Sequence, residues 1–354
     1  MAAPAVPARP ATGTEVTGFV ARAQAYLRRR LDRPDLTVTG TCQATGGGSR
    51  LTRSVTIEWT DHDGRRQERL VFRLDPPAGI LDSNRHLEFE MYSAFHPVEG
   101  VPVPEPILVE DDPQHLGMTF LLMRWLPGSG SKAGVMRPEY DAVRPRLGRQ
   151  MFEILGTIAR TPVEQLHLPY ASRNGLDWRD RLDHWHDVMA GHALGPTPVF
   201  DAVIRYLRRN PPPPAPTTVV HGDFRIGNYL YTAEDGIQGV VDWELSHLGD
   251  PHEDLAYACL PYWRPMAHPD LIAGAITEPE AIGIWERTSG LVASREALRI
   301  WTMFAYIRLA AILSTGAYFV ARGEATEALQ TATGITEPPR FQLLAAELIE
   351  VADR

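Results

Sequence analysis

Residues 219–228 of the chain read Val-Val-His-Gly-Asp-Phe-Arg-Ile-Gly-Asn, and residues 239–244 read Gly-Val-Val-Asp-Trp-Glu. The two stretches place Asp223, Asn228 and Asp242 in a fixed order, each at the end of a β-rich run. Asp223 can accept a hydroxyl proton, whereas Asn228 and Asp242 supply the hard oxygen ligands that Mg²⁺ prefers. A base followed by an amide ligand, and then by a carboxylate at a second strand end, is typical of a site that transfers a phosphoryl group.

The composition indicates an ordinary globular protein. Hydrophobic residues make up 44% of the chain and charged residues 22%, as in globular proteins generally. A length of 354 residues is enough to bury a core in one large or two modest domains. A net charge of −9 argues against non-specific nucleic-acid binding, which relies on clustered Lys and Arg. Cys42 and Cys259 lie outside any Cys-X-X-Cys pattern, so the sequence indicates a reducing compartment and no disulfide scaffold.

Two segments are candidates for a targeting or membrane role, and the sequence favours neither. Residues 1–10 lack a basic segment that leads into an apolar one, so we interpret them as a loose tail and not as a signal peptide. Residues 300–320 are long and apolar enough to span a bilayer, but Arg308 near their middle would cost about 2.5–3.5 kcal/mol to insert. We expect a buried core helix there, and a cytoplasmic protein that binds no membrane.

Hydrophobic periodicity predicts two regions of different character. The first is β-rich, with a Gly-containing turn at residues 61–64; its expected elements are a helix at 14–31, strands at 36–42, 51–60 and 66–74, a helix from an N-cap at Ser83 to Phe95, and strands at 107–110 and 118–124. The second is mainly helical, with helices at 139–160, 178–190 and 199–208, a strand at 217–220, and helices after Asp254. The sequence therefore predicts an α+β, bilobal fold: a nucleotide-binding lobe with a small antiparallel sheet (1–124) and a helical catalytic and acceptor-binding lobe (125–354), with a cleft between them.

A glycine-rich segment between the first two predicted strands is a candidate phosphate-binding loop. It contains Gly46, Gly47, Gly48 and Ser49, and glycines allow backbone N–H groups to approach phosphate oxygens closely. No Gly-Lys-Ser/Thr follows, so the segment is not a Walker A loop. A plain hairpin turn is the alternative interpretation.

A phosphoryl-transfer site also needs a cation on the third strand and an acid on the next helix that orients it. Arg73 fits the cation, and Glu88, preferred over Glu90, fits the acid. An Arg keeps the charge and can bind phosphate bidentately, although a solvent-facing strand Arg would look the same. The expected crossing into the second lobe offers three candidates for contact with an adenine ring: Met123, Arg124 and Trp125.

Arg225 lies two residues beyond the proposed base and is a candidate for neutralising charge on the transferring group. Ordinary turn chemistry is an alternative explanation for the aspartates and the asparagine. A metal hydrolase is a second alternative, with a cluster of His221, Asp223, Asp242, His247, Asp250 and His252. Those histidines lack helical i, i+4 pairing, and the cluster leaves Arg73 unexplained. A nucleotide-binding pseudokinase without transfer activity is a third.

The motifs resemble the aminoglycoside phosphotransferase family, which shares a protein-kinase-like bilobal fold with choline kinases. The resemblance rests on residues 221–228, on Val-Asp-Trp-Glu at 241–244, and on the Gly-Asp-Pro and Asp-Leu-Ala of residues 249–256; in order it runs from Gly46 to Ala256. The forms at 221–228 and 242–251 are similar to the branch whose members occur fused to, or beside, acyl-CoA dehydrogenases, some of which phosphorylate hydroxyacyl-CoA thioesters.

This resemblance implies ATP and Mg²⁺ as cofactors, Asp223 as the catalytic residue, and Asn228 and Asp242 as metal ligands. Arg73 stands where many relatives have Lys, which leaves the choice between ATP and GTP open.

The sequence after Asp254 favours an acceptor that is not a polycation. It is rich in aromatic and basic residues: Tyr257, Tyr262, Trp263, Arg264, Trp301, Phe304, Tyr306 and Arg308. Most of the aromatic residues among them are expected in the core. An aminoglycoside would instead require a concentrated acidic pocket. We therefore expect an ATP-dependent kinase of a small-molecule alcohol, with a macrolide-like or hydroxyacyl-CoA acceptor favoured over an aminoglycoside.

Overall fold

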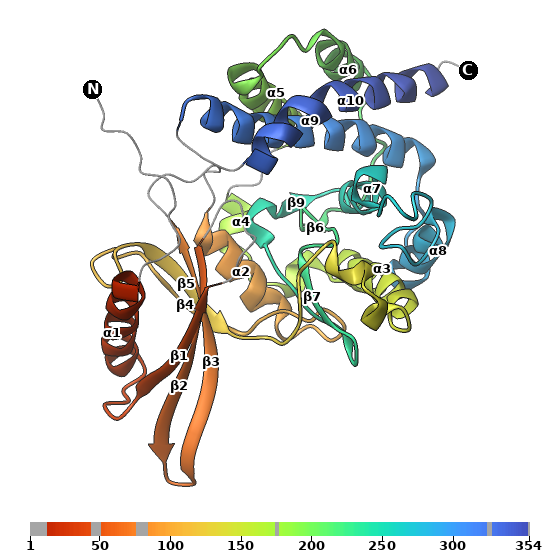
Figure 1. Cartoon of the computed structure of the whole chain (residues 1–354). Coiled ribbons are helices and arrows are strands. Elements are labelled where there is room, and N and C mark those ends of the chain that lie inside the picture. The colour runs from red at the N-terminus through yellow and green to blue at the C-terminus, as the bar shows by residue number, and fades with distance from the viewer. Residues whose placement is uncertain (1–12, 44–50, 76–83, 174–176, 324–327, 353–354) are drawn as a thin grey trace.

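The computed structural model describes residues 13–43, 51–75, 84–173, 177–323 and 328–352. An antiparallel sheet with one helix on each face forms one end of the molecule, and helices form most of the remainder (Figure 1). The predicted α+β class with a small antiparallel sheet near the N-terminus is therefore confirmed. The boundary of the first lobe at residue 124 stays a prediction, although the last strand of the sheet ends at Arg124.

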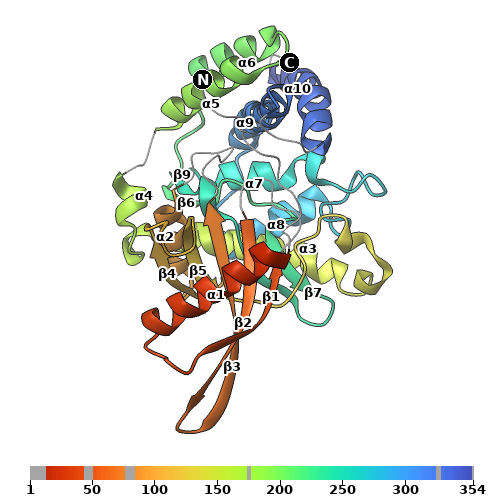
Figure 2. The same cartoon turned by 60° about the vertical axis from the view of Figure 1, so that its left-hand side comes forward.

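The sheet has five strands in the order β1-β2-β3-β5-β4, and neighbouring strands are antiparallel. The strands are β1 (Thr37–Gln43), β2 (Leu51–Asp61), β3 (Gly64–Asp75), β4 (Pro106–Glu110) and β5 (Thr119–Arg124). Asp61 pairs with Gly64 across the predicted turn, and Gly64 has a φ of 117°, which residues with a Cβ rarely adopt. This long hairpin extends away from the helical region (Figures 1 and 2).

Helices α1 (Gly13–Arg30) and α2 (Arg85–Phe95) cover opposite faces of the sheet. Phe120 and Leu122 of β5 share a core cluster with α1, whereas Leu121 and Met123 share one with α2. This alternation follows from the period of two in a strand, and it attaches α2 to the core of the second lobe. The N-cap of α2 is Asn84, whose Oδ1 accepts from two backbone N–H groups; the expected cap, Ser83, lies outside the described residues.

The second lobe is mainly helical, as predicted. Its elements outside the catalytic segment are η1 (Gly134–Met136), η2 (Pro138–Tyr140), α3 (Arg144–Arg160), η3 (Val163–Gln165), α4 (Pro169–Arg173), α5 (Trp178–His192), α6 (Pro198–Arg209), η5 (Pro261–Trp263), α8 (Glu278–Ser289), α9 (Arg295–Ala321) and α10 (Ala328–Ala352). The helix expected from residue 139 begins only at Arg144. Pro145 causes the difference, because a proline without an N–H fits only the first turn of a helix.

Helix α9 is long and apolar enough to cross a membrane, and it is the one such helix among the described residues. However, 72% of its most apolar window is buried within the protein. It packs with α5, α7 and α10 at the helical end of the molecule (Figure 1). Arg308, near its middle, is buried against a carboxylate. The helix therefore packs as a core helix, as the sequence predicted.

The catalytic segment consists of short strands that lead into a helix. Strand β6 (Thr218–Val220) pairs with β9 (His247–Gly249), and β7 (Tyr229–Thr232) pairs with β8 (Gly236–Val240). The one-turn η4 (Trp243–Leu245) precedes β9, and α7 (His252–Cys259) follows it. The sequence did not predict β9, because three residues are too few to show a periodicity. This pairing brings residues 221–223 and 242–250 together.

Candidate active site

The backbone around the proposed base can adopt its shape only with glycine at position 222. Gly222 has a φ of 85°, and a Cβ at this position would collide with the carbonyl oxygen of Leu245. Asp242 also adopts a left-handed conformation, with φ 73° and ψ 53°, which Asp tolerates better than most residues. Residues 223 and 242 thus follow the ends of β6 and β8, which belong to two different two-stranded sheets.

The Asp223 carboxylate is held by three donors. The Tyr257 hydroxyl donates to Oδ1 at 2.6 Å and Arg225 Nε donates to the same oxygen at 3.0 Å. Asn228 Nδ2 donates to Oδ2 at 2.6 Å and to the Asp223 carbonyl oxygen at 2.9 Å. These contacts fill Oδ1 and leave Oδ2 the freer oxygen. The sequence-predicted residues 223, 225 and 228 therefore come together.

Arg73 links the sheet to the catalytic segment. Its NH1 lies 3.0 Å from Glu88 Oε1 and its NH2 lies 2.7 Å from Asp242 Oδ1. The Tyr92 hydroxyl donates to Glu88 Oε1 at 3.1 Å and accepts from the Asp242 N–H at 3.2 Å. A guanidinium can bond to both acids at once through separate nitrogens, which a Lys ammonium does less readily. The preferred acid of α2, Glu88, is thus the one that faces Arg73.

Glu90, the less favoured candidate, has another role. Its two oxygens accept from the backbone N–H groups of Tyr170 and Ala171 at 2.7 and 2.9 Å. These residues lie in the first turn of α4, where N–H groups lack partners within the helix. Glu90 therefore caps α4 and is directed away from Arg73.

His221 and Asp254 fix the backbone of the catalytic loop from inside. Asp254, on α7, accepts from the N–H groups of His221 and Gly222 at 2.6 and 2.9 Å. His221 Nδ1 accepts from the Asp223 N–H at 3.2 Å, and its Nε2 lies 3.1 Å from the Val241 carbonyl oxygen. Burial lowers the pKa of His221 to about 4, so the ring stays neutral and Nδ1 can accept. Burial, with the charge of Glu253, raises the pKa of Asp254 to about 7.

A buried charge cluster supports α7 from behind. Glu253 bonds to Arg181 at 2.7 Å, to Arg308 at 2.9 Å and to His247 at 3.1 Å. Despite burial, Arg181, the bond with His247 and Arg308 hold the pKa of Glu253 far below its usual range. The Arg308 guanidinium also lies 4.5 Å from the centre of the Tyr257 ring. The cluster therefore packs against the ring of the tyrosine that contacts Asp223.

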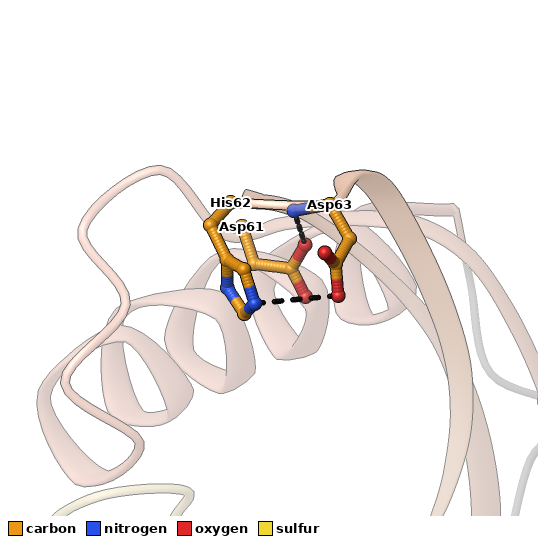
Figure 3. Close-up of side chains that lie close together, drawn as sticks. All are labelled: Asp61, His62 and Asp63. Atoms are coloured by element: carbon orange, nitrogen blue, oxygen red, sulfur yellow. Dashed lines mark hydrogen bonds and ion pairs between the residues drawn. The ribbon is translucent and has the colours of Figure 1, made fainter.

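The residues of the alternative hydrolase cluster do not gather into a metal site. His247 bonds to Glu253, which is not a member of the cluster, and His252 bonds to Asp250, which is. Within the ranges that the structure describes, one trio of His, Cys, Asp or Glu side chains has its ligand atoms close together: Asp61, His62 and Asp63. This trio lies at the tip of the exposed β2–β3 hairpin, as Figure 3 shows, and Arg66 pairs with both of its carboxylates, at 2.8 and 2.7 Å. We assign it no metal.

The remaining predicted nucleotide contacts are placed only in part. Gly46, Gly47, Gly48 and Ser49 lie outside the described residues. Met123 is buried in β5, whereas Arg124 Nε pairs with Glu105 at 2.6 Å. The backbone N–H groups of Arg124 and Trp125 donate to the carbonyl oxygens of Glu105 and Arg69, so an adenine ring would use other backbone groups of this segment. Their contact with a nucleotide stays a prediction.

Two tyrosines contact site residues in ways that the sequence analysis does not predict. Tyr92 lies one helical turn after Glu88, and residues four apart lie on the same helix face, so this spacing is the sequence signal for its contact with Glu88. For Tyr257 the sequence predicts only an aromatic residue in the segment after Asp254. Its hydroxyl contact with Asp223 joins two residues 34 positions apart, and no local pattern encodes it.

The comparison with known families agrees with this site. Residues 51–291 match the phosphotransferase enzyme family, abbreviated APH. The match covers well over half of the chain, so the chain belongs to this family. The predicted class of enzyme, a phosphotransferase with a hydroxyl acceptor, is thereby confirmed.

Curated relatives support the predicted branch. The chain is 30% identical over 206 residues to acyl-CoA dehydrogenase family member 10 of Mus musculus, which covers 57% of this chain and 19% of the relative. It is 28% identical over 255 residues to acyl-CoA dehydrogenase family member 11 of Gallus gallus; this alignment covers 69% of this chain and 32% of the relative. The aligned part is thus a third or less of these relatives' length.

Solved structures show the same protein-kinase-like fold. A putative aminoglycoside phosphotransferase from Ralstonia eutropha superposes with a TM-score of 0.70 at 18% identity, over 93% of this chain and 98% of the other. The GDP complex of aminoglycoside 2'-phosphotransferase-IIIa gives 0.58 at 14% identity, over 92% and 98%. Amicoumacin kinase hAmiN in complex with AMP-PNP, Ca²⁺ and Ami gives 0.53 at 15% identity, over 94% and 96%. At these identities the likeness shows the fold alone.

Proposed function

We propose that this protein is an ATP- and Mg²⁺-dependent small-molecule kinase that transfers the γ-phosphoryl group to a substrate hydroxyl, with Asp223 as catalytic base. The observation that carries the proposal is the junction of Asp223, Asn228 and Asp242 with the Arg73–Glu88 pair. Asn228 bonds to the base, and Asp242 pairs with the cation of the sheet. The structural neighbours in complex with GDP and with AMP-PNP and Ca²⁺ support a nucleotide and a divalent cation.

The residues present fit a magnesium ion. The hydrogen bonds from Asn228 Nδ2 to Asp223 leave the amide oxygen as the atom that can ligate a cation. The Asp242 side chain, 28% exposed, adds a carboxylate, and both groups are hard oxygen ligands. When bound, the ion would neutralise charge on the transferring phosphates. Asn228 and Asp242 would hold it.

The chain's own residues can then carry the transfer. The acceptor hydroxyl would give its proton to Asp223 Oδ2 while its oxygen bonds to the γ-phosphorus and the bond to the β,γ-bridging oxygen breaks, which releases ADP. Arg225 bonds to the Asp223 carboxylate and would stabilise the negative charge of the transferring group. Arg73, held by Glu88, would face the phosphates from the sheet.

The test of this function compares Asp223→Ala with Asp235→Ala, a control in the exposed β7–β8 turn. Asp223→Ala should lower the release of ADP from MgATP about 10²–10⁴-fold, because general-base catalysis contributes that much. ATP binding, followed by thermal shift with and without Mg²⁺, should stay close to wild type in both variants. Full activity of Asp223→Ala would refute the role of the base, and a wild-type chain that binds ATP without turnover would indicate a pseudokinase.

For the acceptor we propose a macrolide-like or hydroxyacyl-CoA alcohol over an aminoglycoside. Beside Asp223 lie Arg225 and the rings of Tyr257 and Trp263, so this side of the base presents a cation and apolar surface. Turnover should be measured with a macrolide, a hydroxyacyl-CoA thioester and kanamycin. Turnover of kanamycin alone would overturn the preference.

A further inference from the structure

One lysine occurs in the whole chain. Lysine and arginine together number 35, and Lys132 is the single lysine among them. A lysine ammonium differs from a guanidinium because it is compact, has freely rotating donors and changes its pKa readily with its surroundings. Lys132 lies in the segment that follows β5, and its side chain remains accessible to solvent.

This ammonium group is held close to the active site. Lys132 Nζ donates to the Tyr262 carbonyl oxygen at 3.1 Å, and it lies 5.1 Å from the ring centres of both Tyr262 and Trp263. The Arg225 guanidinium lies 4.6 Å from the centre of the same Trp263 ring. Arg225 in turn bonds to Asp223. Two cations therefore share one aromatic ring next to the catalytic carboxylate.

Among the residues that the structure describes, the positive charges around Lys132 are not fully balanced by acids. Partial burial and the charge of Arg225 both lower the pKa of Lys132, whereas Glu337 of α10 acts in the opposite direction. Glu337 is itself 3.4 Å from Arg340, so its charge is already shared. Asp223 is likewise shared with Arg225. Like charges in one place are unfavourable on their own and are stabilised by an anion between them.

We infer that Lys132, together with Arg225 and the Trp263 ring, forms a subsite for an anionic group, a carboxylate or a phosphate, carried by the hydroxyl acceptor. The inference rests on the proposed function and narrows its substrate class. One of the Lys132 donors is fixed by Tyr262, and two remain for the anion. A polycationic acceptor is repelled by the same two side chains.

A single lysine allows a direct test on the full chain. Selective labelling with lysine ¹³C-enriched at Cε gives Lys132 the one labelled side-chain signal in the NMR spectrum and leaves its three N–H donors intact. The chain, saturated with MgADP, is titrated with four compounds of matched size: glycerate, glycerol 3-phosphate, glycerol and 3-amino-1,2-propanediol. The Lys132 signal should move saturably with the two anions, and their comparison distinguishes carboxylate from phosphate. It should not move with the neutral or cationic compound.

Variants of the unlabelled chain complete the test by calorimetry with the same compounds. Lys132→Ala should weaken binding of the preferred anion about tenfold or more, since a hydrogen bond to a charged group is lost. Lys132→Arg should retain most of the affinity. Arg137→Ala removes an exposed cation from the same segment and should change nothing. Equal binding of all four compounds, no binding in the millimolar range, or an unaffected Lys132→Ala would overturn the inference.

Failure of the subsite and failure of the kinase proposal give different results. A chain that binds MgADP and loses ATP turnover on Asp223→Ala, but whose Lys132 signal ignores anions, keeps the proposed function and loses the subsite. A chain that does not bind MgADP at all refutes the kinase, and the acceptor subsite with it.

Discussion

Removal of one hydroxyl group should separate the positioning of the catalytic base from the stability of the fold. Tyr257→Phe deletes the phenol oxygen that donates to Asp223 Oδ1 at 2.6 Å and leaves the ring in place between Arg308 and Trp263. Burial, with the adjacent charge of Asp223, raises the pKa of Tyr257 well above its usual value, so the hydroxyl is a donor throughout the working pH range.

The size of the effect follows from the charge of the acceptor. A hydrogen bond to a charged group contributes about 1.5–3 kcal/mol, which corresponds to about 10–150-fold in rate if the bond positions the base in the transition state. The nucleotide does not contact this hydroxyl in the proposed function. We therefore expect kcat to fall by this factor while the KM for ATP changes less than about twofold.

Tyr229→Phe is the matched control. Tyr229 is as deeply buried, and the charges of Arg225 and Asp223 affect it as well. Among the described residues, however, its hydroxyl has no hydrogen-bond partner. Its removal should leave kcat unchanged and should leave the thermal midpoint unchanged or slightly higher, because an unpaired buried hydroxyl is unfavourable.

The assay is the steady-state release of ADP from MgATP, with the thermal midpoint of each variant measured in parallel. A kcat for Tyr257→Phe within twofold of wild type would refute the reasoning. So would equal losses in the two variants, because then the hydrogen bond to Asp223 would have no special role.

Three further changes test the supporting structure. Glu253→Gln should lower the free energy of unfolding by about 3–5 kcal/mol, because buried Arg181 and Arg308 lose their counter-charge. With an unfolding entropy of about 2.1 cal/mol/K per residue over 354 residues, this loss lowers Tm by about 4–7 °C. The exposed Asp183→Asn is the control and should change Tm little; similar midpoints for the two variants would contradict the role of Glu253. Since burial lowers the pKa of His221 to about 4, its contribution is present above about pH 6.5 and is lost as pH falls toward 4. Burial, with the charge of Glu253, raises the pKa of Asp254 to about 7, which adds stability as the pH falls over the same range, so the quantity to measure is the stability of wild type relative to His221→Gln. Denaturant titrations should show this difference falling by about 2 kcal/mol between pH 7 and 5, and a constant difference would contradict the role of His221. Arg73→Lys should lower the Tm of the nucleotide-free chain, because an ammonium replaces a guanidinium that binds both Glu88 and Asp242. Arg65→Lys, at the exposed ion pair with Glu58, should leave Tm unchanged. Equal shifts in Tm would contradict the bridging role of Arg73.

Local sequence patterns predict much of the fold. Residues 118–124 are predicted to form a strand, and the glycine of residues 61–64 predicts the turn between β2 and β3; both are found. Boundaries were less certain where a proline intervened, as at the start of α3. The strand β9 was missed because it exists only through pairing with β6.

The sequence by itself determined the chemistry of the site: the order and type of Asp223, Asn228 and Asp242, and the pairing of an Arg on a strand with an acid on the next helix. These follow from residue types and short spacings, which local backbone rules convert into position. Only the tertiary structure decided which groups contact the base. Tyr257, Arg225 and Lys132 meet around Trp263 because α7, the catalytic loop and the segment after β5 pack together, and such packing depends on the whole core and not on any one stretch of chain.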